Sequence, residues 1–258
     1  MRDYLDILAQ TAKETIHSGY YNITAAAASK LSLRKAILEV KNAPVIAEIK
    51  PASPSTGIIR KDIDIRSITR GIEKGGAVGI SVLTEPKHFK GALHLLAEAR
   101  KTSRLPILMK DIILSPLQLD AASKLGADAV LLIAALFERG YCEYGIQDMI
   151  ARAHALGLEV LLETHTEAEF RSAVRTQADL VGINNRDLAT LKVDLNTTKE
   201  ILQRNNTEGK TVVSESGIKT PADVRFLHSC GAHAFLIGSA VMFADNIEKK
   251  VREFVSAL

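Results

Sequence analysis

Along most of the chain, short apolar runs alternate with stretches whose apolar residues recur at helical spacing. A strand of a parallel sheet is buried on both faces, so it reads as an almost continuous apolar run. Eight such runs predict strands, and the stretches that follow them predict helices. The predicted strands lie near 45–50, 79–83, 106–110, 129–133, 159–163, 180–184, 211–215 and 234–238, and the predicted helices near 64–75, 91–102, 115–125, 141–156, 166–177, 194–203, 220–230 and 244–257.

Start and stop signals support several of these helices. Capping residues or prolines stand where helices should begin, and glycines follow where they should end; these are Ser115-Pro116, Thr166 with Glu169, Thr220-Pro221, Gly126, Gly157 and Gly231. Eight strand–helix units in 258 residues are typical of one closed (β/α)8 TIM barrel rather than a doubly wound open sheet. We expect a single α/β barrel domain over residues 1–258.

Residues 1–42 differ from the rest of the chain. Leu5, Leu8, Ala12 and Ile16 fall at helical spacing, and residues 33–40 predict a second helix. Both precede the first predicted strand. We expect residues 1–42 to form an N-terminal helical extension within the barrel domain.

Six of the apolar runs end on a polar or charged residue. A charge beside an apolar core is costly unless it is paired, so a repeated pattern needs an explanation. In a (β/α)8 barrel the carboxyl ends of the strands form the rim of the active site. The runs are 45–50, 107–110, 160–163, 181–184, 212–216 and 235–239.

Glu48 and Lys50 are two residues apart on the first strand, so both side chains point to one face. Inside a barrel that face is the interior near the mouth, which favours a catalytic pair over an ion pair on a solvated strand end.

Lys110 ends the third strand and Glu163 the fifth. Nearby cations would lower the pKa of Lys110 toward that of a useful general acid, although alone it reads as a lysine reaching out to solvent. Glu163 would then move a proton, since Thr166 already caps the next helix.

Polar and glycine-rich turns follow the last three strands. Asn184-Asn185-Arg186 can orient hydroxyls and face a carboxylate, but the run is equally typical of an Asn-rich turn. Ser214–Ile218 and Ile237–Ser239 supply glycine and serine after strands seven and eight. Barrels often bind phosphate there through backbone amides, so we favour a phosphate site over two structural turns.

Charge and composition narrow the class of partner. The net charge of +3 and a pI near 8.8, without a dense Lys/Arg tract, argue against nucleic acid and suit a small anionic substrate. No apolar stretch is long enough to span a bilayer. Two unpaired-looking cysteines and an N-terminus without a signal-peptide core predict a cytoplasmic protein.

The seven histidines lack metal spacing, so no zinc is expected, and His165 is interpreted as a solvated loop residue.

The motifs of this chain resemble those of the indole-3-glycerol phosphate synthase family of tryptophan biosynthesis. The most specific are Lys50-Pro51-Ala52-Ser53-Pro54-Ser55, which follows Glu48, and Ser214-Glu215-Ser216-Gly217-Ile218. Further similar segments extend the resemblance over about the whole chain, including the N-terminal helices; they are residues 82–85, 89–91, 106–111, 126–133, 158–163 and 182–188.

The resemblance implies an enzyme without cofactor or metal. Its substrate would be 1-(2-carboxyphenylamino)-1-deoxyribulose 5-phosphate, which undergoes ring closure, decarboxylation and dehydration. By resemblance, Lys110 is the general acid of ring closure, Glu163 the base or acid of dehydration, and Lys50 the contact to the substrate carboxylate. The other implied site residues are Glu48 and Asn184 for the sugar part, Glu215 and Ser216 for the wall, Ser53, Gly217, Gly238 and Ser239 for the phosphate, Arg186 near the anthranilate, and Phe89 and Leu131 as further substrate contacts.

Two departures from the family pattern stand out. Ile112 occupies a position that is usually aromatic, and the last turn reads Gly238-Ser239-Ala240 without an acidic residue. Two other functions stay open: a phosphate-binding barrel such as a Schiff-base aldolase using Lys110, and a catalytically silent barrel that acts as an interaction module. Association with other tryptophan-pathway enzymes is a further possibility that the sequence does not decide.

Overall fold

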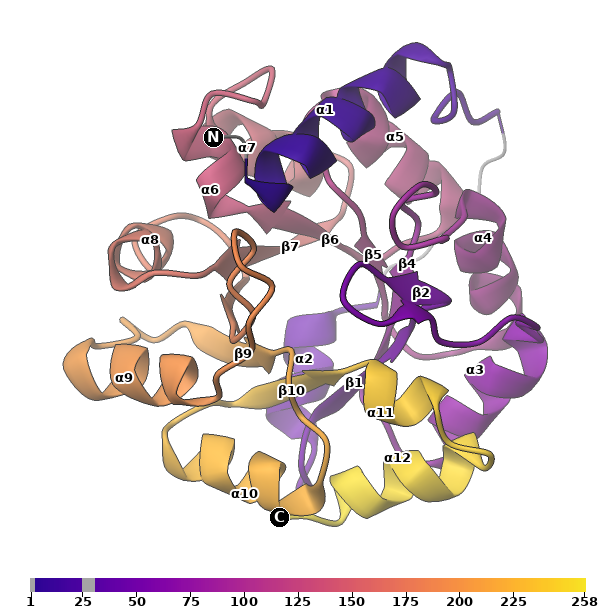
Figure 1. Cartoon of the computed structure of the whole chain (residues 1–258), viewed down its shortest axis with the longest axis vertical. Coiled ribbons are helices and arrows are strands. Elements are labelled where there is room, and N and C mark those ends of the chain that lie inside the picture. Colours follow the sequence, from indigo (N-terminus) through magenta and orange to yellow (C-terminus); the bar gives the residue numbers. More distant parts are fainter. Residues whose placement is uncertain (1–2, 25–30) are drawn as a thin grey trace.

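Eight parallel strands close into a barrel in the computed structural model, which describes residues 3–24 and 31–258 (Figure 1). Around the barrel the order is β1-β10-β9-β8-β7-β6-β5-β4, and β4 pairs with β1 to close it. The strands are β1 Val45–Ile49, β4 Gly79–Leu83, β5 Ile107–Lys110, β6 Ala129–Ile133, β7 Glu159–Thr164, β8 Leu180–Asn184, β9 Thr211–Glu215 and β10 Ala234–Ile237. The predicted (β/α)8 barrel is therefore confirmed.

An outer ring of helices surrounds the barrel (Figure 1). These helices are α3 Ile65–Lys74, α4 Leu93–Thr102, α5 Pro116–Leu125, α7 Ile146–Ala155, α8 Glu167–Ala173, α9 Asn196–Arg204, α10 Pro221–Ser229 and α12 Ile247–Val255. The expected caps are present: Ser115 and Thr220 each form a capping box, and Thr166 accepts the Glu169 amide. Gly126 ends α5 with a left-handed φ of 84°.

The structure differs from the sequence expectations in its short elements. The helix predicted over 141–156 begins only at Ile146, and the helix predicted to reach 177 ends at Ala173, where i→i+3 bonds tighten the chain. Four unpredicted elements are too short for hydrophobic periodicity to reveal; they are α6 Ala134–Glu138, α11 Ser239–Met242, β2 Ala52–Ser53 and β3 Gly57–Ile58.

Helices α1 (Tyr4–His17) and α2 (Leu33–Glu39) confirm the two predicted N-terminal helices. α2 lies at the amino-terminal end of the barrel, where Glu159 of β7 accepts hydrogen bonds from Ser32 and the Arg34 amide. α1 lies across the opposite end, beside the barrel mouth (Figure 1). Apolar residues of both helices pack with the barrel interior, whereas a second apolar layer fills the space between the strands and the outer helices. The carboxyl ends of the strands thus face a cavity bordered by α1.

Candidate active site

Four alternate strands each bring one charged side chain to the same inner layer of the barrel. They are Glu48 of β1, Lys110 of β5, Glu163 of β7 and Glu215 of β9. Side chains of alternate strands meet in layers in this fold, and here the layer nearest the mouth is charged. Lys110 Nζ lies 3.0 Å from Glu163 Oε2 and 3.3 Å from Glu215 Oε2. One ammonium group therefore bridges two carboxyl groups whose side chains are only 2% and 1% exposed.

Lys50 extends from the end of β1 and pairs with Glu48, with 2.8 Å between Nζ and Oε1. The two-residue spacing that predicted a shared face is matched by this contact. Gly238, after β10, leaves room for the pair: a Cβ there would lie 2.4 Å from Glu48 Oε1 and 3.0 Å from Lys50 Nζ. The glycine is thus required by the ion pair itself, in addition to any phosphate contact.

The expectation of a lowered pKa for Lys110 is wrong. Burial does lower it, but the negative charges of Glu163, Glu215 and Glu48 outweigh burial and hold the pKa of Lys110 above its ordinary value. Lys50, another cation at the rim, is paired with Glu48. Lys110 is therefore charged at neutral pH and can donate a proton.

The two carboxyl groups that flank Lys110 are driven apart in pKa. Burial would raise the pKa of Glu163, but Lys110, His165 and a hydrogen bond from Asn184 together bring it well below its usual range. Burial raises the pKa of Glu215 to about 8; Lys110 opposes this, and the nearby acidic groups reinforce it. Paired groups with separated pKa values are typical of acid–base sites. In the unliganded protein Glu163 is the ionised member of the pair.

His165 is not the solvated loop residue that was expected. Its side chain is 11% exposed, and Nε2 lies 3.3 Å from Glu163 Oε1. The residue directly follows β7, so folding turns its ring back against the strand end. Sequence alone carried no sign of this contact, because residues 163 and 165 share a face only if the strand geometry continues beyond Thr164.

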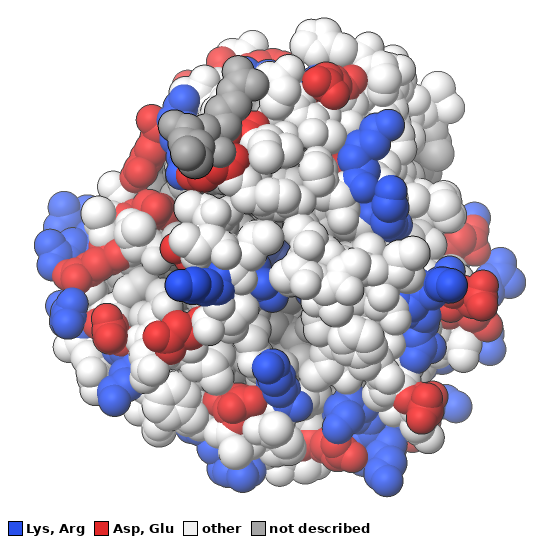
Figure 2. Space-filling view, viewed as in Figure 1, with Lys and Arg blue, Asp and Glu red and all other residues white. Residues whose placement is uncertain are grey.

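A cavity of about 570 Å³ lies above this layer, at the barrel mouth. Figure 2 shows a hollow near the centre of this face, with Lys and Arg side chains beside it. All the residues proposed from the sequence line the cavity: Glu48, Lys50, Ser53, Phe89, Lys110, Leu131, Glu163, Asn184, Arg186, Glu215, Ser216, Gly217, Gly238 and Ser239. Ile112, the departure from the family pattern, also lines it.

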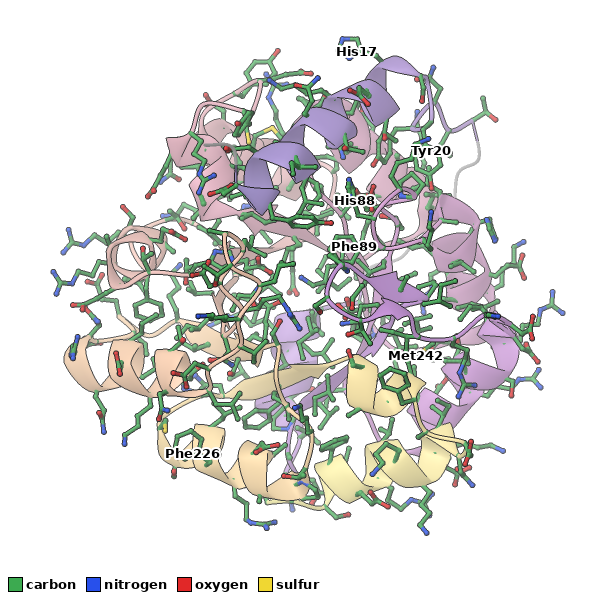
Figure 3. All side chains as sticks on the ribbon, viewed as in Figure 1. His17, Tyr20, His88, Phe89, Phe226 and Met242 are labelled. Carbon is green, nitrogen blue, oxygen red and sulfur yellow. The ribbon has the colours of Figure 1, made fainter. Side chains whose placement is uncertain are left out.

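One wall of the cavity is apolar and includes residues that the sequence analysis did not assign to the site. Tyr4 and Leu8 of α1 contribute to it together with Phe89 and Leu131. In Figure 3, Phe89 and His88 lie beneath α1 at the rim of the barrel. His88 joins the rim to α1, since its ring nitrogens lie 2.9 Å from the Tyr4 hydroxyl and 3.1 Å from the Thr11 hydroxyl. An apolar wall beside a charged floor suits a ligand with an aromatic part and anionic groups.

Several polar atoms at the site are buried and lack a hydrogen-bond partner among the described residues. They include Glu48 Oε2, Ser53 Oγ and Glu215 Oε1, whereas Glu215 Oε2 forms no hydrogen bond within the described residues but lies in the ion pair with Lys110. Buried polar groups are normally satisfied, so these atoms are candidates for substrate contacts. Arg186 also borders the cavity, but its Nη1 already donates to Ser55 Oγ and to the Leu191 carbonyl, each over 3.0 Å.

Gly182 is a site residue that the sequence analysis left without a role. It lies beside Glu163 in the strand register, and a Cβ there would be 2.2 Å from Glu215 Oε1. A glycine inside a strand often marks such a close approach. That signal was present in the sequence, but only the neighbouring strand shows which group needs the space.

Asp111 connects the end of β5 to the N-terminal segment. Its carboxyl accepts hydrogen bonds from the hydroxyls of Tyr21 and Thr84. Burial raises the pKa of Asp111 to about 6, while these bonds and the Ile112 amide oppose the rise. The residue that follows Lys110 is thereby fixed by contacts from two other segments.

Within residues 3–24 and 31–258, no group of three or more His, Cys, Asp or Glu side chains is arranged to hold a metal ion. No helix in this part of the chain has both the length and the apolar character needed to cross a membrane.

Comparison with known proteins agrees with the geometry. A synthase from Desulforamulus reducens is 42% identical over 224 residues, covering 87% of this chain and 83% of the relative. One from Neisseria meningitidis serogroup C is 48% identical over 207 residues, covering 80% and 77%. Both are named indole-3-glycerol phosphate synthase.

A solved structure supports the fold alone. Thiamine phosphate pyrophosphorylase from Pyrococcus furiosus superposes with a TM-score of 0.63 at 18% identity, over 88% of this chain and 97% of that one. The family model described as indole-3-glycerol phosphate synthase matches residues 4–254. With that match over nearly the whole chain, the protein belongs to the indole-3-glycerol phosphate synthase family.

Proposed function

We propose that this protein converts 1-(2-carboxyphenylamino)-1-deoxyribulose 5-phosphate into indole-3-glycerol phosphate. The observation that carries the proposal is the position of Lys110, charged and held between Glu163 and Glu215 on the floor of a cavity with an apolar wall. Ring closure develops negative charge on the ketose oxygen, and a fixed ammonium group stabilises such charge. The family named by the comparisons carries out this reaction, which makes the protein a carboxy-lyase.

In the proposed first step, the aromatic carbon that bears the carboxylate attacks the ketose carbonyl carbon. Lys110 donates a proton to the carbonyl oxygen as the new carbon–carbon bond forms. Lys50, held by Glu48 at 2.8 Å, contacts the substrate carboxylate. The iminium generated within the substrate then accepts the electron pair released as CO2 leaves, so the reaction itself supplies the electron sink.

In the final step, water leaves and the pyrrole ring becomes aromatic. The new hydroxyl departs as water with a proton from Lys50, since Lys110 gave its own proton in ring closure, and Glu163 accepts the proton from the neighbouring ring carbon. Its low pKa in the free protein is set partly by Lys110, so loss of the Lys110 proton makes Glu163 a stronger base. Asn184 and Glu48 hold the sugar part, and Glu215 and Ser216 form the wall beside it.

The remaining contacts divide between the two ends of the substrate. Around the phosphate we place Ser53, whose buried hydroxyl lacks a partner among the described residues, with Gly217, Gly238 and Ser239. Around the anthranilate we place Arg186, Phe89 and Leu131, which line the cavity. Cytoplasmic location and association with other tryptophan-pathway enzymes stay predictions from the sequence.

The direct test is incubation of the full chain with this substrate while indole fluorescence is followed. Formation of indole-3-glycerol phosphate, verified by mass, would support the proposal. A folded protein that leaves the substrate unchanged would contradict it.

Borohydride trapping is expected to leave Lys110 and Lys50 unmodified. An aldolase lysine must be neutral to form an imine with a carbonyl, whereas the carboxylates around Lys110 keep it charged. The full chain would be treated with borohydride in the presence of the keto-sugar substrate and analysed by mass spectrometry. A stoichiometric reduced adduct on either lysine would place the protein among Schiff-base enzymes.

Gly238→Ala is expected to lower kcat/KM by about 100-fold, because displacement of catalytic groups by an ångström can have an effect of this size. The added methyl would lie 2.4 Å from Glu48 Oε1 and must displace the pair with Lys50. Gly145→Ala is the matched control, since its methyl would meet only Asp148 Oδ2 at 3.8 Å. Equal rates in the two variants would mean that the pair tolerates displacement.

A further inference from the structure

The two carboxyl oxygens of Glu163 have different partners. Oε2 lies 3.0 Å from Lys110 Nζ. Oε1 lies 3.3 Å from His165 Nε2, an ion-pair contact without hydrogen-bond geometry. Lys110 lines the cavity, whereas the His165 ring is not part of its wall. Glu163 therefore lies between the Lys110 ammonium group, which lines the cavity, and the His165 ring, which does not.

On its other side, the His165 ring lies beside the carboxylate of Glu169 of α8. Nδ1 lies 3.5 Å from Glu169 Oε2, and the same oxygen accepts the His165 amide over 2.8 Å. The other oxygen of Glu169 accepts the Thr166 hydroxyl, and the Glu169 amide donates back to Thr166. The first turn of α8 thus holds the His165 backbone and places a second carboxylate beside the ring, which in turn lies within ion-pair distance of Glu163.

We propose that His165 is a positioning residue of the reaction, which holds Glu163 oriented and ionised from outside the cavity while Lys110 transfers its proton inside it. The inference rests on the proposed function and adds a residue to its machinery. Once Lys110 has given its proton to the substrate, its attraction for Glu163 is lost. Of the two cations beside Glu163, only His165 then still favours the ionised form of its carboxyl group.

The electrostatic surroundings are consistent with a charged ring. Burial lowers the pKa of His165, but its contacts with Glu163 and Glu169 raise it to about 9 overall. The acidic groups that face the ring are Glu163 on β7, Glu169 on α8 and Asp187 in the loop after β8. Below about pH 9 the imidazole is therefore cationic.

His165→Asn is expected to shift the acidic limb of the kcat/KM profile upward. Loss of an opposite charge at this distance raises a carboxyl pKa by about one to three pH units, so Glu163 becomes protonated at higher pH. KM should change little because the ring does not line the cavity. Glu169→Gln, which removes the charge behind the ring, should shift the limb in the same direction by less.

His154→Asn is the matched control. His154 also pairs with a carboxylate, since Nε2 lies 2.9 Å from Asp179 Oδ2. His154 belongs to α7 and Asp179 directly precedes β8, so this pair lies at the amino-terminal end of that strand, away from the cavity. Its profile should match the wild type. A His165→Asn variant that loses the same factor at every pH has a merely structural defect, and this result or an unchanged profile would overturn the inference.

A second measurement does not depend on activity. Nitrogen-15 NMR of the imidazoles should show His165 protonated to about pH 9 in the full wild-type chain. In Glu163→Gln the same ring should deprotonate at lower pH. A His165 ring that titrates at the ordinary histidine value in the wild type would overturn the inference. A wild-type chain with that charged ring but no product formation would instead count against the proposed function.

Discussion

Lys110→Met is expected to fold and to lose about 10²–10⁴-fold in kcat, the usual contribution of a general acid, with a further loss from transition-state electrostatics. Met fills a similar volume but cannot donate a proton or stabilise the developing oxyanion. In the unsubstituted protein Lys110 lies within 3.3 Å of both Glu163 and Glu215. Because Met leaves the buried Glu163 carboxylate with His165 as its remaining cationic neighbour, the pKa of Glu163 should rise and the melting temperature should fall.

Steady-state turnover, circular dichroism and thermal unfolding measure these effects together. Lys101→Met is the control, since Lys101 pairs with Glu98 at 2.7 Å but is 67% exposed. Exposed ion pairs contribute little to stability, so its turnover and melting temperature should remain close to the wild type. Near-wild-type turnover in folded Lys110→Met would remove Lys110 from the mechanism.

Glu163→Gln is expected to keep substrate binding and to lose about 10²–10⁴-fold in turnover. Glutamine preserves the shape of the side chain and removes its charge and its ability to accept the proton. Ring closure depends mainly on Lys110, so an intermediate before dehydration should accumulate. Single-turnover experiments with rapid quenching and mass analysis would detect this species as the decarboxylated, still hydrated product.

Glu159→Gln provides a control on the same strand. Glu159 lies at the opposite end of β7 and accepts hydrogen bonds from Ser32 and the Arg34 amide near α2. Its substitution should lower stability and spare turnover. If Glu163→Gln instead raises KM while kcat stays unchanged, Glu163 is a binding group and its proposed role in proton transfer is wrong.

The architecture could be predicted from the sequence because its signals are local. Continuous apolar runs and capping residues such as Ser115, Thr166 and Thr220 are short-range consequences of backbone geometry, and each was found where expected. The position of the active-site rim could be predicted from the same pattern, because polar residues that follow buried strands have to gather at one end of a parallel barrel. The residues assigned to the site from the family motifs all line one cavity.

The ion pairs and pKa shifts of the site depend on the tertiary structure. Charge effects act through space, and barrel closure decides which of the rim charges become neighbours. It places Lys110 of β5 against Glu163 of β7 and Glu215 of β9 and leaves Lys50 with Glu48, which reverses the expected direction of the Lys110 pKa shift. Closure also buries His165 behind Glu163. The sequence by itself determined which groups stand at the mouth of the barrel, whereas only the folded chain decided which carboxylates surround Lys110, because Glu163 and Glu215 lie on strands dozens of residues away from it along the chain.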